Sequence, residues 1–233
     1  MMSVELNKKR IRLFAITLEP MDLLWFASYD ASGLANTETV IHNYALTYAL
    51  SRFERGIVYR DYPTYEEDLL QMQWYCVPAK AEKYEKMSFS WNAINSCTHQ
   101  TLDANFNKRN TPMLGRKNTI VPIPYSKFTF YAFNFNNEQP VRVIRLGKKR
   151  TPCRLIWEEI ANPVAIKREQ CRPSHCINPL DVQGNMLQYQ IVSIPPSLVL
   201  KTVIIQDDWE IRSNNHFVHV PQCVCIRGGF IDN

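Results

Sequence analysis

The chain has 233 residues, 45% of them hydrophobic, and its 27 Lys and Arg residues against 22 Asp and Glu residues give a formal net charge of +5. This length fits one large domain with a sizeable core, and the sequence contains no apolar run of about 18 residues that could span a membrane. It also lacks a secretory leader pattern, a G-x-G-x-x-G motif and a P-loop, which argues against secretion and against a Gly-rich phosphate-binding fold. With seven scattered cysteines, we expect a cytoplasmic protein with reduced thiols.

The chain is expected to begin with a strand, a loop and a helix. Residues 11–18 are rich in apolar and β-branched side chains, which predicts a mostly buried first strand. A loop that carries Trp25 follows. Residues 36–53 then repeat their apolar side chains with helical period around most of the circumference, so we expect a core helix packed on more than one side. Asn36 or Thr37 would be its N-cap.

Shorter elements are predicted next, and then an inserted arm. A strand at 56–60, a helix from the capping box at 64–67 to about residue 72 and a strand at 74–77 are expected. Residues 79–120 are predicted to be an insertion that projects as a partly β-hairpin arm, because residues 95–118 are too polar for the core and too many for an ordinary loop. The basic residues of this arm are Lys108, Arg109, Arg116 and Lys117. A solvated, mobile loop is the alternative.

The second half is expected to be rich in strands. Residues 127–135 carry five aromatic side chains and predict a central strand covered on both faces, which would form a hairpin with the next strand at 141–146. Another strand is expected at 154–159 and an irregular segment at 161–186. Short strands are expected at 190–194, 198–205, 209–212 and 216–220, followed by an exposed tail from residue 227. The predicted fold class is α+β, with a ferredoxin-like core decorated by hairpins.

Two loops concentrate positive charge beside aromatic and Asn residues. The first is 108–117 and the second is 142–154, where the densest basic cluster of the chain comprises Arg142, Arg145, Lys148, Lys149, Arg150 and Arg154. Lys and Arg neutralise phosphates and aromatic rings stack on unpaired bases, so this pattern favours nucleic-acid binding over an ordinary solvated turn.

Catalytic and metal-binding patterns are weaker. His42 with Tyr44, or His99 with the lysines of the arm, could supply the acid and base of a metal-independent ribonuclease. A zinc site could be formed by Cys171, His175, Cys176, Cys223 and Cys225, but the spacing of these residues is not that of known zinc ribbons or fingers. We therefore expect no catalytic residues, no metal and no cofactor.

Three stretches resemble the type I-D CRISPR effector (Cascade) subunit family known as Cas5 or Csc1. They are Thr37-x-x-Val-Ile-His-Asn-Tyr-Ala-Leu-Thr-Tyr-Ala-Leu50, Pro63-x-Tyr-x-x-Asp-Leu69 and Arg145-Leu-Gly-Lys-Lys-Arg-Thr-Pro152. The similarity covers essentially the whole chain, which would then be a single domain of residues 1–233 from the RAMP superfamily. The resemblance implies an RRM-like (ferredoxin-like) core with a protruding β-hairpin thumb, and a β-rich C-terminal half.

The resemblance also implies a role in antiviral defence. Such subunits hold the 5′ handle of the CRISPR RNA, cap one end of a filament of backbone subunits, and contact the large subunit near the protospacer-adjacent motif of double-stranded target DNA. Sequence specificity is then delegated to guide–target pairing. We expect a non-catalytic subunit; the alternative is a metal-independent endoribonuclease that processes precursor CRISPR RNA, as some relatives in other subtypes do.

The resemblance suggests a role for each basic or aromatic site. In the matched basic turn, Lys148, Lys149 and Arg150 beside Arg145 would grip handle phosphates. At the start of the matched helix, His42, Asn43 and Tyr44 would offer hydrogen bonds and a stacking face to splayed bases, although core packing is the alternative for Tyr44. The arm residues Lys108, Arg109, Arg116 and Lys117 would contact the first spacer nucleotides, the neighbouring backbone subunit, or target DNA.

Overall fold

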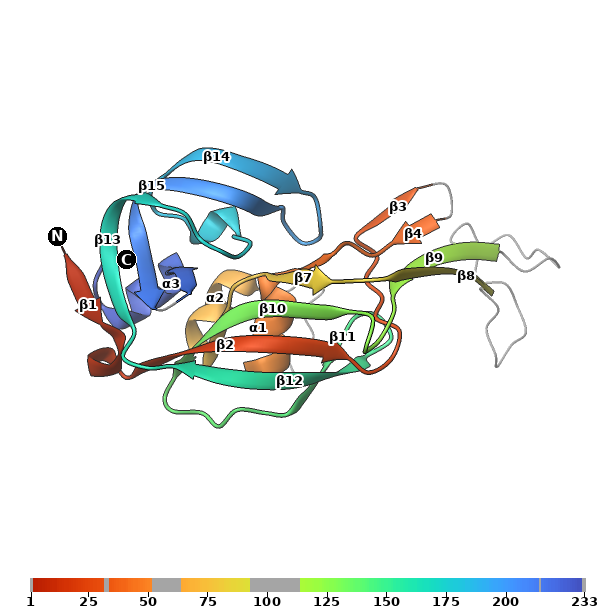
Figure 1. Cartoon of the computed structure of the whole chain (residues 1–233), viewed down its shortest axis with the longest axis horizontal. Helices are drawn as coiled ribbons and strands as arrows, with labels where there is room; N and C mark the ends of the chain where they lie inside the picture. The colour runs from red at the N-terminus through yellow and green to blue at the C-terminus, as the bar shows by residue number, and fades with distance from the viewer. Residues whose placement is uncertain (1, 32–33, 52–63, 93–113, 214, 232–233) are drawn as a thin grey trace.

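The computed structural model describes residues 2–31, 34–51, 64–92, 114–213 and 215–231. Within these ranges the protein is built mainly from three β-sheets, with three short α-helices (Figure 1), so the predicted α+β class with a β-rich C-terminal half is confirmed. None of the helices in the described ranges is long and apolar enough to cross a membrane.

The central sheet is antiparallel and has the strand order β11-β12-β2-β10-β7-β5, with β6 also paired to β10. Its strands are β2 (Ile11–Pro20), β5 (Val40–Ile41), β6 (Trp74–Cys76), β7 (Ala79–Lys83), β10 (Lys127–Phe135), β11 (Val143–Leu146) and β12 (Thr151–Ile160). The predicted first strand and the predicted central aromatic strand are therefore confirmed as β2 and β10, which pair along eight residues. Phe128, Phe130 and Phe133 of β10 are each at most 1% exposed and fill the main core.

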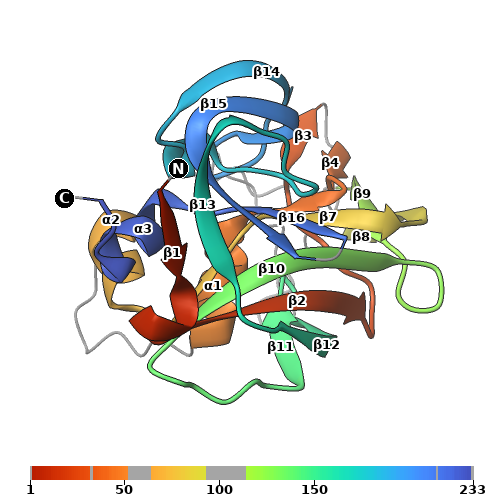
Figure 2. The same ribbon diagram turned by 60° about the vertical axis from the view of Figure 1, so that its left-hand side comes forward.

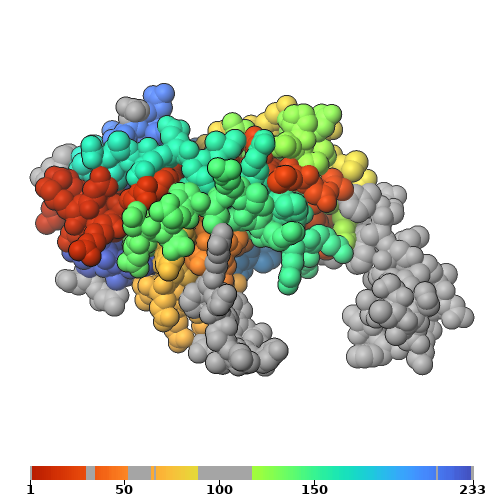
Figure 3. Space-filling view, turned by 90° about the horizontal axis from the view of Figure 1, so that it is seen from below, coloured from red at the N-terminus to blue at the C-terminus, as the bar shows by residue number. Residues whose placement is uncertain are grey.

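The helices α1 (Asn43–Ser51) and α2 (Tyr65–Gln71) lie on one side of the central sheet. Viewed from below, their orange surface emerges on one side of the red and green strands (Figure 3). The apolar face of α1 packs into the main core through Leu46 and Leu50. The helix begins at Asn43 rather than at residue 36, because residues 34–36 and 40–41 pair as strands β4 and β5. The N-cap is therefore not Asn36 or Thr37; instead the Nδ1 atom of His42 accepts the N–H of Tyr44.

A second sheet, formed by the C-terminal part together with the N-terminal strand β1, lies above the central sheet (Figure 2). Its order is β1-β13-β15-β14, with β16 on the other end of β15, and its bounds are β1 (Ser3–Glu5), β13 (Val164–Cys171), β14 (Asn185–Val192), β15 (Val199–Ser213) and β16 (His216–His219). The segment at 161–186 is thus not irregular throughout, since β13 lies within it. The tail is also ordered in part: α3 (Gln222–Gly228) ends the fold, and Phe230 packs against Trp209 with 5.1 Å between ring centroids.

The third sheet forms the projecting end of the molecule in Figure 1. It has the order β3-β4-β9-β8, with β3 (Tyr29–Ala31), β4 (Leu34–Asn36), β8 (Lys86–Asn92) and β9 (Leu114–Ile120). Within the predicted arm, β8 and β9 form an antiparallel pair, the β8–β9 hairpin. β7 belongs to the central sheet, so the predicted bounds 79–120 include a strand of that sheet. The predicted strand at 56–60 and the arm segment 93–113 lie outside the described residues.

The predicted hairpin between residues 127–135 and 141–146 is wrong. β11 pairs with β12 through the tight turn Gly147–Arg150, whereas β10 lies between β2 and β7. Two 3-10 helices, η1 (Leu6–Lys9) and η2 (Pro179–Asp181), complete the elements. In η2 the side chain of Asn178 accepts the N–H of Leu180, an N-cap that starts the turn beside α1.

Candidate nucleic-acid interface

Two lysines that are distant from each other in the sequence both approach the indole of Trp25. The ammonium of Lys117, on β9, is 3.7 Å from the ring centroid, and the ammonium of Lys148, in the β11–β12 turn, is 5.4 Å from it. The backbone N–H of Lys148 also donates to the carbonyl of Trp25 at 2.9 Å. The loop after β2 therefore joins the hairpin and the basic turn into one cationic site.

The backbone of the turn explains why it can approach Trp25 so closely. Gly147 has φ of +73°, and a Cβ at this position would lie 2.5 Å from the carbonyl oxygen of Trp25. Both features require glycine. Arg150 closes the turn in the left-handed region at φ of +52°, and its carbonyl accepts a hydrogen bond from Arg145 at 3.1 Å. The tight turn thereby presents the exposed side chains of Lys148 and Lys149.

The charges of three lysines act on one another at this site. Burial lowers the pKa of Lys117, and the positive charges of Lys149 and Lys148 lower it further. In contrast, Arg154 of the predicted basic cluster is paired with Glu19 at 2.5 Å, so its charge is already balanced. The positive field is therefore centred on the exposed lysines of the turn, which suits phosphate groups.

An apolar pocket of about 410 Å³ opens beside this cationic site. Its lining includes His42, Tyr44 and Lys148, so the structure brings together two groups of residues that the sequence predicted separately. The other lining residues are mostly aromatic or aliphatic and comprise Phe26, Ala27, Ser28, Val40, Ile41, Ala45, Tyr48, Tyr65, Ile194, Pro195 and Pro196. A largely apolar cavity with a cation at its edge can hold a flat, unstacked base while the cation meets its phosphate.

The two rings at the start of α1 form part of the pocket wall. His42 and Tyr44 contact each other edge to face with 4.7 Å between centroids, and Tyr44 lies the same distance from Tyr65. Burial lowers the pKa of His42 to about 4 and raises that of Tyr44 to about 12, so both are neutral at pH 7. Because Nδ1 of His42 accepts a backbone N–H, its Nε2 donates to Ser197 Oγ at 2.9 Å.

Asn43 does not belong to this pocket, contrary to the prediction that it contacts RNA bases together with its two neighbours. Its side chain is fully buried, and its amide nitrogen donates to Tyr75 Oη at 3.3 Å and to Asp181 Oδ2 at 3.4 Å. Its amide oxygen accepts from Asn178 at 3.2 Å. Asn43 thus connects α1 to the segment that leads into the second sheet and has a structural role.

The remaining predicted arm residues are only partly placed. Lys108 and Arg109 lie outside the described residues, and so does His99. For Arg116 the backbone position is known: it pairs with Ser90 of β8 and with Leu34 of β4. Lys117 is the arm residue that the structure joins to the basic turn.

Some lining residues were missed by the sequence reasoning. The aromatic content of the loop at Trp25 was visible, but nothing in it indicated that Lys117 and Lys148 would meet there. Pro195 and Pro196 lie between the strands predicted at 190–194 and 198–205, and the structure places them in the wall of the pocket. Their role depends on how the second sheet packs on the first, and local sequence carries no signal for that.

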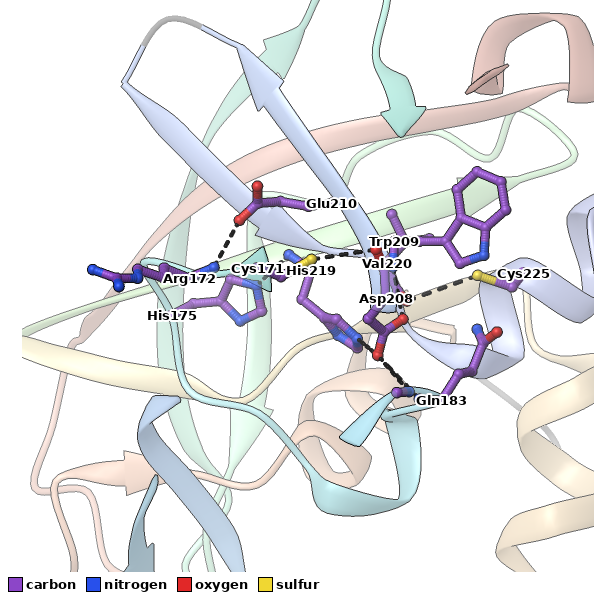
Figure 4. A network of polar contacts seen from close by, with 11 residues as sticks. Cys171, Arg172, His175, Gln183, Asp208, Trp209, Glu210, His219, Val220 and Cys225 are labelled. Atoms are coloured by element: carbon purple, nitrogen blue, oxygen red, sulfur yellow. Dashed lines mark hydrogen bonds and ion pairs between the residues drawn. The ribbon is translucent and has the colours of Figure 1, made fainter. Parts of the chain in front are cut away.

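Three of the candidate zinc ligands, Cys171, His175 and Cys225, are seen in Figure 4 in or beside a buried network around Asp208. Cys171 Sγ donates to the carbonyl of Asp208, and His219 Nε2 lies 3.1 Å from Asp208 Oδ2. His175 bonds the carbonyl of Cys176 through Nδ1 and accepts the N–H of His219 through Nε2. Across the described ranges, no group of three potential metal ligands is found, and the six cysteines present form no disulfide.

Comparison with known proteins identifies a matching family and solved structures of similar fold. The protein family described as "Type I-D CRISPR-associated protein Cas5/Csc1" matches residues 11–229. A chain of the solved structure "Cryo-EM structure of the Type III-B Cmr-beta bound to cognate target RNA and AMPPnP, state 1" is similar over 82% of this chain and 86% of that chain, with a TM-score of 0.50 and 10% identity. At that identity the likeness concerns the fold alone. No curated protein sequence matches the chain.

Proposed function

Since the chain belongs to the type I-D CRISPR-associated Cas5/Csc1 family, we propose that it acts in the type I-D effector complex as a non-catalytic subunit that binds the 5′ handle of the CRISPR RNA. The observation that carries this proposal is the meeting of Lys117 and Lys148 over Trp25, beside an apolar pocket that Lys148 also lines. Phosphates of the handle would lie against the basic turn, and a splayed base would enter the pocket and stack on its aromatic wall.

The fold supports the same proposal at the level of architecture. The strand order β12-β2-β10-β7, with α1 between β2 and β6 in the chain, supports a ferredoxin-like core of the RAMP type. The second helix of such a core would lie between β10 and β12, and the described residues of that connection contain no helix. The projecting β8–β9 hairpin would be the thumb. The similar Cmr-beta structure is bound to target RNA, which supports RNA as a ligand of this architecture.

The partners follow from this position in the complex. We propose that the chain caps one end of the backbone filament, with the hairpin toward the neighbouring backbone subunit, and that it contacts the large subunit near the protospacer-adjacent motif of double-stranded target DNA. In this arrangement base pairing between guide and target supplies sequence specificity, and the chain recognises the handle.

The environment of His42 supports binding rather than cleavage. Among the described residues that line the apolar pocket, His42 is the histidine, and its pKa of about 4 keeps its imidazole neutral at pH 7. Both of its ring nitrogens already have partners, one on Tyr44 and one on Ser197. A general acid and base for RNA cleavage need pKa values near the working pH and a free position facing the substrate.

Co-expression with the other subunits and a CRISPR array, followed by crosslinking and sequencing of the bound RNA, tests the proposal. We expect the chain in one large complex with crosslinks at the 5′ handle. Recovery of the chain without handle RNA would contradict it. Incubation of the full chain with repeat RNA in EDTA tests the non-catalytic part: intact RNA is expected, and cleavage that His42→Ala abolishes would establish the endoribonuclease alternative instead.

A further inference from the structure

A second pocket, rich in lysine, lies between β7 of the central sheet and β15 of the second sheet. It has a volume of about 390 Å³. Its polar lining comes from Thr39, Lys80, Ser174, Lys201, Thr202 and His175, whose two ring nitrogens already have partners within the protein. Among the described residues, none of the groups that line it is acidic. Two cations and several hydroxyl groups with no carboxylate make this pocket suitable for an anion.

Lys80 is held in place at this pocket by the backbone. Its ammonium donates to the carbonyl of Ser174 at 2.5 Å, across the space between the two sheets. An ammonium has three donors, so this single bond leaves the charge and two donors for a ligand. The contact fixes one cation at the boundary between the sheets.

Lys201 and Thr202 reach the pocket through an irregularity in β15. The pairing of β14 with β15 shifts register between Gln188 and Gln190, the latter opposite Lys201, and Thr202 has φ of +51°. A β-branched residue in the left-handed region is rare and strained. Neighbouring residues of a regular strand point to opposite faces, but here both line one pocket, as a β-bulge allows.

The two ammonium groups also act on the same buried atom. Burial raises the pKa of the Cys176 thiol to about 11, and the charges of Lys201 and Lys80 both oppose that rise. Lys80 and Lys201 therefore both bring positive charge to this pocket.

The lysine pocket is a neighbour of the apolar pocket described above. A small buried cluster of Val40, Cys176, Ile194 and Val199 separates them, with Val40 and Ile194 lining the apolar pocket and Cys176 lining the lysine pocket. We propose that the lysine pocket binds a phosphate group, and that this phosphate belongs to the RNA strand whose base occupies the apolar pocket. The assignment to RNA rests on the proposed function, whereas the phosphate site itself does not.

The test compares Lys201→Gln with Lys167→Gln, a control that removes a lysine from β13 of the same sheet. Two probes are used on the full chain: fluorescein-labelled repeat RNA in anisotropy titrations across salt concentrations, and inorganic phosphate in thermal unfolding. We expect Lys201→Gln to bind RNA about 3- to 10-fold more weakly, with the salt slope reduced by about 0.7 because one phosphate is no longer neutralised. Lys201→Arg keeps the charge and should bind nearly as the parent chain does.

Each outcome decides the question. If Lys201→Gln weakens RNA binding and Lys167→Gln does not, the result supports a phosphate of the nucleic acid as the ligand of the pocket. A rise in the unfolding temperature with inorganic phosphate that Lys201→Gln removes, without an effect on RNA, supports the site with free phosphate as its ligand. If Lys201→Gln matches Lys167→Gln with both probes, the proposal is wrong. The Lys148→Glu/Lys149→Glu chain, titrated in parallel, shows separately whether the proposed handle site fails.

Discussion

The ammonium of Lys117 lies 3.7 Å from the centre of the Trp25 ring, in contact with a residue 92 positions earlier in the chain. This contact stabilises a lysine whose pKa is lowered by burial and by two neighbouring lysines. Attraction to the ring is worth about 0.5–2 kcal/mol, and it offsets part of the cost of burial and repulsion. The contact therefore helps to keep a positive charge at the root of the hairpin, beside the basic turn.

Lys117→Met tests what this charge is for. The variant loses the attraction to the ring but also the repulsion and the burial of a charge, so the free energy of unfolding should change by less than about 1 kcal/mol. Affinity for handle RNA should fall by about 2- to 5-fold, because Lys117 is buried and acts through its field rather than by direct contact. Urea unfolding and RNA anisotropy measure the two quantities. Unchanged RNA affinity would show that Lys117 has only a structural role.

Reversal of charge at Lys148 and Lys149 should have a larger effect. Both side chains are exposed in the basic turn, so Lys148→Glu/Lys149→Glu should weaken handle-RNA binding by at least about 10-fold and reduce the salt slope by about 0.7 for each phosphate that is no longer neutralised. The matched control is Lys8→Glu/Lys9→Glu, which makes the same change in η1 at the other end of β2. Equal affinities and slopes for the two double variants would exclude the turn as the phosphate-binding site.

The sequence predicted the parts of this site better than their arrangement. Helical periodicity placed His42, Asn43 and Tyr44 near the start of a packed helix, and composition identified the basic turn. Successive helical residues differ by about 100° in direction, so one of Asn43 and Tyr44 had to face away from the other. Asn43 turns toward Asp181 because a buried carboxyl and amide need partners, and Asp181 is 138 residues away in the sequence. Local patterns contain no information on such a pairing.

Strand pairing failed for a related reason. The aromatic strand β10 and the next strand, β11, are neighbours in sequence, and consecutive strands usually pair. Here β11 turns back at Gly147 onto β12, which leaves β10 to pair with β2 along most of its length. The turn between β11 and β12 is held against Trp25 by the N–H of Lys148, a contact between segments about 120 residues apart that local sequence does not reveal.

Gly147→Ala should disturb that turn. A residue with a Cβ costs about 1–2 kcal/mol at positive φ, and here the Cβ would also lie 2.5 Å from the Trp25 carbonyl, so we expect a loss of at least about 2 kcal/mol in the free energy of unfolding. The displaced turn should also bind handle RNA more weakly. Equilibrium denaturation and RNA anisotropy on the same samples check both effects.

Gly229→Ala is the control for Gly147→Ala. Gly229 has a similar φ of +65°, but the nearest atom to an added Cβ would be Lys9 Nζ at 3.9 Å, so only the cost of the backbone conformation, about 1 kcal/mol, should appear. RNA binding should not change, because Gly229 follows α3. If the two variants were equally stable and bound RNA equally well, the close approach of the turn to Trp25 would have no energetic importance.

A buried carboxyl group makes stability depend on pH near neutrality. Asp181 is buried against Tyr75 and Asn43, and burial raises its pKa to about 7. In the unfolded chain the pKa is about 4. A raised folded-state pKa contributes stability that is complete below about pH 4 and is lost as the pH rises to about 7, at up to about 1.4 kcal/mol per pH unit. Above pH 7 the contribution changes little further.

Asp181→Asn should remove this dependence, because an amide does not ionise and its oxygen can still accept the hydroxyl of Tyr75. We therefore expect the variant to gain stability relative to the parent chain as the pH rises from 5 to 7, and the difference to level off by pH 8. Urea unfolding at each pH measures it, and Asp22→Asn at an exposed site controls for the substitution itself. Parallel curves for Asp181→Asn and the parent chain would mean that Asp181 is ionised in the folded protein across this range. The junction between α1 and the second sheet would then hold a buried negative charge rather than a neutral acid.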